Sequence, residues 1–158
     1  MNGNSSRLEN PNEDIGYLIW RVSKYWQRGK HKILDEFGLT TSQLELLGAI
    51  YHMSSHNIEA TQIILSQETD IDPMTTSTTL RNLERKGLIR RYESTTDTRA
   101  RIVKLTDTGK DLFEKAVVKL KNEQNKLFSN MDLNLNELKT QLSLLLKELD
   151  KIGKSDNK

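Results

Sequence analysis

Apolar residues recur at every third or fourth position along much of the chain, which is the spacing of one face of an α-helix. The first stretch runs from Ile15 to Phe37, and Gly38 follows it as glycine commonly follows the end of a helix. A second helix is predicted to begin at Thr40, because Thr40 and Gln43 have the spacing of a capping box. The residues expected on its buried face are Leu44, Leu47, Ile50 and Tyr51.

The middle of the chain predicts two short helices separated by a turn. Residues 52–59 are expected to lead into them as a connection, with a short edge strand near Ile58. The first helix begins near Thr61. The second begins at Asp72-Pro73, where Asp caps the helix and Pro needs no N–H. Two short helices joined by a turn of this length form a helix-turn-helix.

A β-hairpin is predicted directly after Gly87, which ends the second short helix. Residues 88–94 are rich in strand formers, a polar turn follows, and residues 100–105 return as a second strand. A hairpin in this place is the wing of a winged helix. Thr106 then caps a long helix, and a last helix begins near Asn134 with Glu137 as its capping partner. The last helix carries an apolar face made of Leu138, Leu142, Leu145, Leu149 and Ile152.

The predicted fold is mainly α with a small β-hairpin wing: a winged helix-turn-helix with about six helices. A length of 158 residues suits one domain of ordinary size. The absence of cysteine excludes disulfides, thiolate metal sites and sensing by thiol oxidation. No apolar run approaches the roughly 20 residues of a membrane span, and the polar start lacks a signal-peptide core, so we expect a cytoplasmic protein.

The net charge is only +2, but the positive charges are concentrated between Arg81 and Lys104. That segment has eight basic and three acidic residues, a local net charge of +5. Such a stripe is expected of a surface that meets a phosphate backbone. On charge alone, a solvated protein surface explains it equally well.

Residues 60–110 resemble the MarR (multiple antibiotic resistance regulator) family of winged helix-turn-helix regulators, and the resemblance extends over about residues 15–150. One departure is Thr98, which stands in place of the first Arg of the Asp-Arg-Arg that the family's wing usually has. Another is the presence of Thr76 and Thr79 where aliphatic residues are common. The segments that carry the resemblance are Leu83-Glu84-Arg85-Lys86-Gly87-Leu88, Asp97-Thr98-Arg99 and Leu105-Thr106-Asp107-Thr108-Gly109.

The resemblance implies a homodimeric, DNA-binding transcriptional regulator, for which we expect a repressor, although the sequence does not decide between repression and activation. It divides the chain into a flexible arm (1–13), dimerisation helices (14–38 and 106–152), a DNA-binding lobe (39–105) and a tail (153–158). A two-fold dimer implies a pseudo-palindromic operator in double-stranded DNA. The apolar face of the last helix fits dimerisation, although packing within one subunit remains open. The alternative function is a dimeric winged-helix adaptor that binds proteins without specific DNA binding.

Helical phasing predicts which side of the recognition helix meets DNA. It buries Thr76, Leu80 and Leu83, and it turns Met74, Thr75, Ser77, Thr78, Arg81 and Arg85 toward the groove. The guanidinium of Arg81 matches the two acceptors of guanine. By resemblance, Arg99 enters the adjacent minor groove, steered by Asp97. The residues expected to meet phosphates beside it are Arg91, Arg101 and Lys104.

Other signals in the sequence are weaker. By resemblance, Tyr17, Trp20, Tyr25 and Trp26 could line a pocket for a small aromatic or phenolic effector, although such a stripe is more often core or dimer interface. Zinc is not expected, because the histidines (His31, His52 and His56) lack a clear third ligand at metal-binding spacing. No enzyme motif is present, so neither catalysis nor a cofactor is expected.

Overall fold

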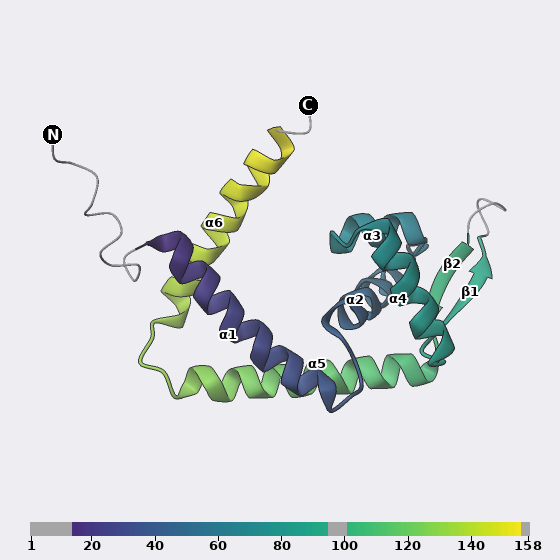
Figure 1. The fold of residues 1–158 in the computed structure, drawn as a ribbon, viewed down its shortest axis with the longest axis horizontal. Helices are drawn as coiled ribbons and strands as arrows, with labels where there is room; N and C mark the ends of the chain where they lie inside the picture. Colours follow the sequence, from purple (N-terminus) through teal and green to yellow (C-terminus); the bar gives the residue numbers. More distant parts are fainter. Residues whose placement is uncertain (1–13, 95–100, 156–158) are drawn as a thin grey trace, which may run out of the picture. The chain divides into compact units, whose positions relative to one another are not determined.

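The computed structural model describes residues 14–94 and 101–155. In these residues it has six helices and one two-stranded sheet, which confirms the predicted fold class (Figure 1). The predicted arm (1–13), the wing tip with Asp97 and Arg99, and residues 156–158 lie outside the described residues. The elements are α1 (Ile15–Asp35), α2 (Thr41–Ser55), α3 (Gln62–Thr69), α4 (Pro73–Arg85), β1 (Ile89–Glu93), β2 (Arg101–Leu105), α5 (Asp107–Ser129) and α6 (Leu135–Ser155).

The helices begin where their capping residues predict. At α2 the capping box is complete, since Thr40 Oγ1 accepts from the Gln43 amide at 3.2 Å and Gln43 Oε1 accepts from the Thr40 amide at 3.1 Å. Thr61 caps α3 by a single bond, since its Oγ1 accepts from the Ile64 amide at 3.3 Å. Thr106 Oγ1 accepts from the Gly109 amide at 3.0 Å and so caps α5. These side chains satisfy backbone N–H groups that have no partner within the helix.

The segment between α2 and α3 differs from its prediction. The helix continues through His52 to Ser55, so the connection is shorter than residues 52–59. The expected edge strand near Ile58 is not the element that pairs. Instead Thr61 forms an isolated bridge with Ile102 of β2, and the Val103 amide donates to the Ala60 carbonyl at 2.8 Å. The position of the extended residues in this segment is therefore determined by tertiary pairing with β2 and not by the β-strand propensity of the residues near Ile58.

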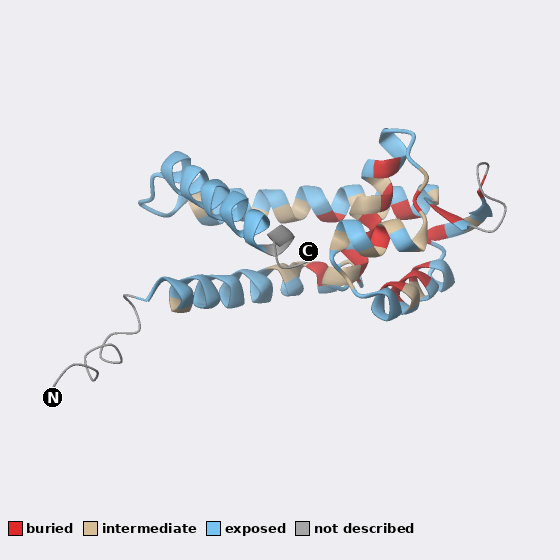
Figure 2. Cartoon of the chain, turned by 90° about the horizontal axis from the view of Figure 1, so that it is seen from above, coloured by how far each residue is buried: buried red, intermediate tan, exposed pale blue. Residues whose placement is uncertain are grey.

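The core lies within α2, α3, α4 and the hairpin, together with the end of α1 and the part of α5 around Ala116. Figure 2 shows that buried residues concentrate there, whereas α1 and α6 are exposed along most of their length. Burial removes apolar surface from water and supplies most of the stability of such a lobe. The fully buried large side chains include Leu34, Leu46, Leu47, Ile50, Leu65, Leu80, Leu83 and Ile89.

The hairpin pairs β1 with β2 in antiparallel register, with Ile89 opposite Leu105 and Tyr92 opposite Ile102. Ile89, Ile102 and Val103 are buried, so the hairpin is fixed to the core at its base. At the far end of β1, Ser94 Oγ donates to Glu59 Oε2 at 2.6 Å. The hairpin is therefore held on two sides before it reaches the wing tip.

The chain divides into two compact units at Leu120–Lys121, within α5. In the second unit, Asn134 caps α6, since the Glu137 amide donates to Asn134 Oδ1 at 3.2 Å, and Asn134 Nδ2 donates to Glu137 Oε2 at 3.4 Å. The leucines on α6 are exposed, for example Leu142 at 49% and Leu149 at 53%. None of the helices among the described residues is both long enough and apolar enough to cross a membrane.

Candidate nucleic-acid interface

The recognition helix α4 has the rotation that its sequence predicts. Its buried residues are Thr76, Leu80 and Leu83, as expected, and also Thr79. Thr76 and Thr79, which occupy positions where aliphatic residues are common, bury their side chains and leave the helix phase unchanged. The opposite side exposes Met74, Thr75, Thr78, Arg81 and Arg85, while Ser77 is half-buried.

The first turn of α4 is fixed by Asp72. Its carboxylate accepts a hydrogen bond from the Thr75 amide at 2.9 Å, and Pro73 occupies the first helical position. The Thr75 hydroxyl and backbone amide both favour the charged form, which lowers the pKa of Asp72 from its ordinary value. The N-terminal end of α4 is therefore well ordered on the side that a major groove would meet.

The turn before α4 is held from both helices of the pair. The carbonyl of Ile71 accepts from Ser66 Oγ of α3 at 2.6 Å and from Thr76 Oγ1 of α4 at 3.2 Å. Asp70 adopts the left-handed conformation, with φ of 54°, which Asp tolerates better than most residues. The angle between the two helices is thus set by local hydrogen bonds.

The arginines of α4 are oriented by neighbouring side chains. Arg81 Nη2 donates to Thr78 Oγ1 at 3.2 Å, and Arg85 hydrogen-bonds to the Asn82 side chain. A surface pocket lies among these groups and Glu84. It gathers guanidinium, hydroxyl and amide donors, which can bind phosphates or the acceptor edges of bases.

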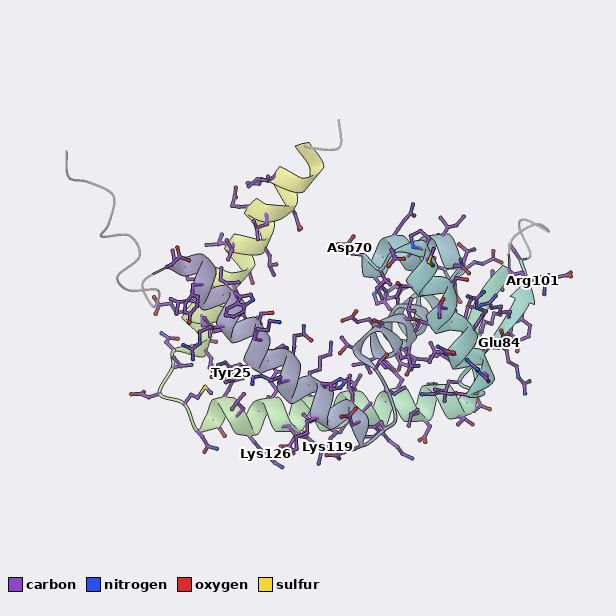
Figure 3. The ribbon with its side chains drawn as sticks, in the orientation of Figure 1. Tyr25, Asp70, Glu84, Arg101, Lys119 and Lys126 are labelled. Carbon is purple, nitrogen blue, oxygen red and sulfur yellow. The ribbon has the colours of Figure 1, made fainter. Side chains whose placement is uncertain are left out.

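The wing contributes cations with two different environments. Arg101 lies exposed on β2 (Figure 3). Lys104 is also exposed, with its ammonium 5.7 Å from the centre of the Tyr92 ring. Arg91 is different, because its Nε lies 3.4 Å from Glu84 Oε2 and its side chain is only 26% exposed. Arg91 therefore connects β1 to α4, a role that its position in the basic stripe does not indicate.

Two residues that sequence reasoning left out of the site hold the recognition helix. Glu84 pairs with Arg91, and Lys86 Nζ donates to the Gly38 carbonyl at 2.6 Å. Both belong to the Leu-Glu-x-Lys-Gly-Leu segment that carries the family resemblance. The sequence signal was thus present, but nothing in the local spacing shows that Lys86 reaches back to the end of α1.

The aromatic residues of α1 form an exposed ladder with cations. Arg21 donates to Tyr17 Oη at 3.5 Å and to Tyr25 Oη at 3.4 Å, and Arg28 lies 4.6 Å from the centre of the Tyr25 ring. The hydrogen bond from Arg21 lowers the pKa of Tyr25 from its ordinary value. Trp20 is 55% exposed and Trp26 is 41% exposed, so neither belongs to the core of the described protomer.

The histidines lie outside this interface. His52 and His56 stack with ring centres 4.3 Å apart, and His56 Nδ1 lies 2.8 Å from the His52 carbonyl oxygen. His31 Nε2 lies 3.8 Å from Asp35 Oδ1. Within residues 14–94 and 101–155, no group of three or more His, Asp or Glu side chains is placed to hold a metal ion.

Comparison with known proteins agrees with this geometry. The sequence matches the family profile described as "ArnR1-like, winged-helix domain" over residues 35–123. A Bacillus subtilis protein described as the uncharacterized HTH-type transcriptional regulator YdcH is 36% identical over 104 residues, which is 66% of this chain and 71% of that protein.

Solved structures show the same fold over most of the chain. MepR of Staphylococcus aureus in complex with DNA is 28% identical with a TM-score of 0.73, covering 89% of this chain and 99% of that chain. MarR of Escherichia coli is 24% identical with a TM-score of 0.69, covering 86% of this chain and 96% of that chain, and shows the likeness of fold alone.

The fold and the exposed face of α4 define a winged helix-turn-helix protein of the DNA-binding class. With the profile match and the relatives above, the chain belongs to the MarR family of winged-helix transcriptional regulators, which is a family of regulators and not of enzymes.

Proposed function

We propose that this protein is a sequence-specific transcriptional repressor that binds a pseudo-palindromic operator as a homodimer in the cytoplasm. The observation that carries the proposal is the face of α4, a capped helix that leaves Met74, Thr75, Thr78 and Arg81 exposed above a buried apolar face. A helix of this kind enters the major groove with its N-terminal end first. The likeness to MepR in complex with DNA supports the same use of α4 here.

The proposed DNA contacts fall into two groups. On α4, Arg81 is the candidate for a bidentate bond to guanine, which would contribute about 1–3 kcal/mol of discrimination. On the wing, Arg101 and Lys104 meet phosphates, and Arg99 enters the minor groove beside Asp97. Arg91 would meet a phosphate only in competition with Glu84. The remaining proposed contacts on α4 are Met74, Thr75, Ser77, Thr78 and Arg85.

The proposed dimer uses the terminal helices, residues 14–38 and 106–152. The apolar side chains on α1 and those on α6 are exposed in the single chain, and an exposed apolar face on a helix is typical of an interaction surface. A second copy would cover both faces by the same contacts, since a two-fold interface is self-complementary. The exposed residues are Ile15, Leu18, Ile19, Val22 and Trp26 on α1, and Leu138, Leu142, Leu145, Leu149 and Ile152 on α6.

The proposed regulation is release of the operator by a small aromatic or phenolic effector. The aromatic ladder of α1, which includes Tyr17, Trp20, Tyr25 and Trp26, supplies ring surface and hydrogen-bonding groups for such a molecule. An effector that binds better to a dimer with badly spaced recognition helices would lower operator affinity by shifting that population.

The test is fluorescence-anisotropy titration of DNA from upstream of the protein's own gene against scrambled DNA, at two salt concentrations. Wild type, Arg81→Ala and Arg99→Ala are compared with Lys115→Ala, which removes a cation that pairs with Asp111 on α5. We expect tight, selective binding that weakens in the two arginine variants and stays unchanged in the control. Binding should fall steeply with salt, because phosphate contacts release counterions.

The opposite outcome is weak, equal binding to both DNAs and to a genome-wide library of fragments. In that case the protein works as a dimeric adaptor, and its exposed apolar faces are surfaces for other proteins.

A further inference from the structure

The C-terminal end of the recognition helix is attached to two other helices at once. Lys86 is the C-cap of α4, and Gly87 follows it in the left-handed conformation, with φ of 71°. Within three residues of chain, 86–88, one bond leads to the turn that follows α1 and others lead to the start of α5. Both α1 and α5 belong to the proposed dimerisation helices.

The attachment to α1 is made by one side chain. Lys86 Nζ donates to the Gly38 carbonyl at 2.6 Å and lies 3.4 Å from Gln43 Oε1. Gln43 is buried, and its Oε1 also accepts from the Thr40 amide at 3.1 Å in the capping box of α2. The ammonium thus bridges the carbonyl of Gly38, in the turn between α1 and α2, and the cap that starts α2, with the strength of a charge-assisted hydrogen bond.

The attachment to α5 is made largely by the backbone. Thr106 Oγ1 donates to the Gly87 carbonyl at 2.7 Å, and the Thr106 amide donates to the Leu88 carbonyl at 3.0 Å. The approach is so close that a Cβ at Gly109 would lie 1.9 Å from the Leu88 carbonyl oxygen. The start of α5 therefore follows the end of α4 closely. Lys86 makes the direct bond from the end of α4 to the turn after α1, while α1 itself also contacts α2 through Lys30 and Glu45 at 3.3 Å.

Apolar packing between α1 and the lobe does not replace that connection. Leu34 and Leu39 are buried at this junction, and burial of this kind is strong but non-directional. This packing holds the end of α1 on the lobe. A short hydrogen bond from a named side chain to a named carbonyl does restrict direction.

We propose that Lys86 is a positioning residue that transmits the placement of α1 to the recognition helix and so sets the separation of the two recognition helices in the dimer. The inference rests on the proposed function, since it assumes a two-fold dimer on two half-sites. It also assigns Lys86 a role other than the phosphate contact that its place in the basic segment 81–104 would suggest.

The variants are Lys86→Met, which keeps the aliphatic stem and removes the donor, and Lys86→Arg, which restores a cationic donor. Lys110→Met makes the same change on an exposed lysine of α5 and serves as the control. Thermal unfolding and sedimentation establish that each variant is folded and has the oligomeric state of wild type.

The first readout needs no DNA. The chain has no cysteine, so Thr78→Cys on α4 gives one spin label in each protomer, and electron–electron double resonance measures the distance between the two. We expect a narrow distribution in the labelled protein, a broader or shifted one with Lys86→Met, and recovery with Lys86→Arg. If no distance between two labels is detected, the dimer itself is overturned. If the distance distributions are identical with and without Lys86→Met, only the role of Lys86 is overturned.

The second readout is affinity for the selected operator and for operators with one base pair inserted or deleted between the half-sites. The affinity of wild type should fall roughly tenfold or more when the spacing is altered, which is comparable to the cost of one mismatched base pair. Lys86→Met should bind the natural operator less tightly and discriminate less between spacings. The proposal is overturned if Lys86→Met loses the same affinity on every spacing and its salt dependence is weaker by about one phosphate contact. That result would show that Lys86 binds the phosphate backbone of the DNA.

Discussion

Glu84 on α4 and Arg91 on β1 lie with Oε2 and Nε 3.4 Å apart, which joins the recognition helix to the wing. The Nε and Nη2 atoms of Arg91 are buried and make no hydrogen bond within the described residues, so Glu84 is the group that balances the buried charge. A buried N–H without a partner costs free energy, and the cost rises when the nearby carboxylate is removed. The pair therefore fixes where the wing starts relative to α4.

We predict that Arg91→Met and Arg101→Met weaken DNA binding differently. Loss of Arg101, which is exposed on β2, should reduce the slope of log affinity against log salt by about 0.9, the value for one phosphate contact on duplex DNA. Loss of Arg91 should leave that slope close to wild type and lower affinity by misplacing the wing. Affinity titrations over a salt series measure both. A slope that falls equally in the two variants would restore the direct phosphate contact that the sequence suggests for Arg91.

The sequence predicted the local parts of this interface well and the long-range parts poorly. Thr40 with Gln43 and Asp72 with Pro73 mark helix starts, because a cap is made by groups that lie within about three residues of one another in the sequence. The destination of Lys86 is a carbonyl 48 residues earlier in the chain, and no periodicity encodes it. In the same way, the bridge between Thr61 and Ile102 forms through tertiary pairing, so the predicted strand near Ile58 was misplaced.

The terminal helices show a different limit of sequence reasoning. Their apolar periodicity predicted helices correctly, but periodicity does not say what covers the apolar face. In the single chain, Leu142 and Trp20 remain about half exposed, which leaves that question to a measurement of oligomeric state.

We predict that Leu142→Glu on α6 converts the dimer to a monomer. Burying one leucine contributes about 1.5–3 kcal/mol, and a two-fold interface loses the contribution twice, so the dissociation constant should rise by roughly two to four orders of magnitude. Gln141→Glu adds the same charge at the neighbouring exposed position and should leave the dimer intact. Sedimentation equilibrium distinguishes the two. A Leu142→Glu protein that remains dimeric would move the interface away from this face of α6.

We predict that Gly109→Ala strongly destabilises the fold although it lies in a helix. The added Cβ would lie 1.9 Å from the Leu88 carbonyl oxygen, so the backbone of α5 or β1 must shift, at a cost on the order of 1–3 kcal/mol or more. Gly29→Ala on α1 is the matched control, since no atom lies within 4 Å of its added Cβ. That variant should gain up to about 1 kcal/mol from helix propensity. Urea unfolding at equal protein concentration gives both values, and similar effects at the two glycines would contradict the close approach.

We predict that Asp72 contributes to acid sensitivity. Its pKa is lowered in the folded protein by the hydrogen bonds from Thr75, so the ionised form stabilises the fold at all pH values above the ordinary Asp pKa of about 3.9. That contribution is lost as the pH falls below this value and through the lowered folded pKa. Asp72→Asn keeps a good capping residue that does not titrate. Unfolding curves from neutral to acidic pH should therefore converge for the two proteins at low pH, and a constant difference would exclude Asp72 as a source of the acid response.

We predict that the operator half-site contains a thymine whose methyl group contacts Met74. Met74 is 80% exposed in the first turn of α4, where an apolar side chain on a groove-facing surface has no core to pack against. Thymine is the base that offers an apolar group in the major groove. Replacing the contacted thymine by uracil removes that methyl alone, and the loss of one buried carbon, about 0.8 kcal/mol, corresponds to roughly fourfold weaker binding. Met74→Ala should bind the thymine operator less tightly and should respond little to uracil. Met131→Ala changes an exposed methionine outside α4 and should retain the full response to uracil.

Uracil substitution at each thymine of the selected operator in turn, measured with all three proteins, locates the contact. A position where wild type and Met131→Ala lose affinity and Met74→Ala does not identifies the base that Met74 recognises. Equal responses of the three proteins at every position would mean that Met74 lies against sugar or solvent and that base selection in this half-site depends on Arg81 and the threonines.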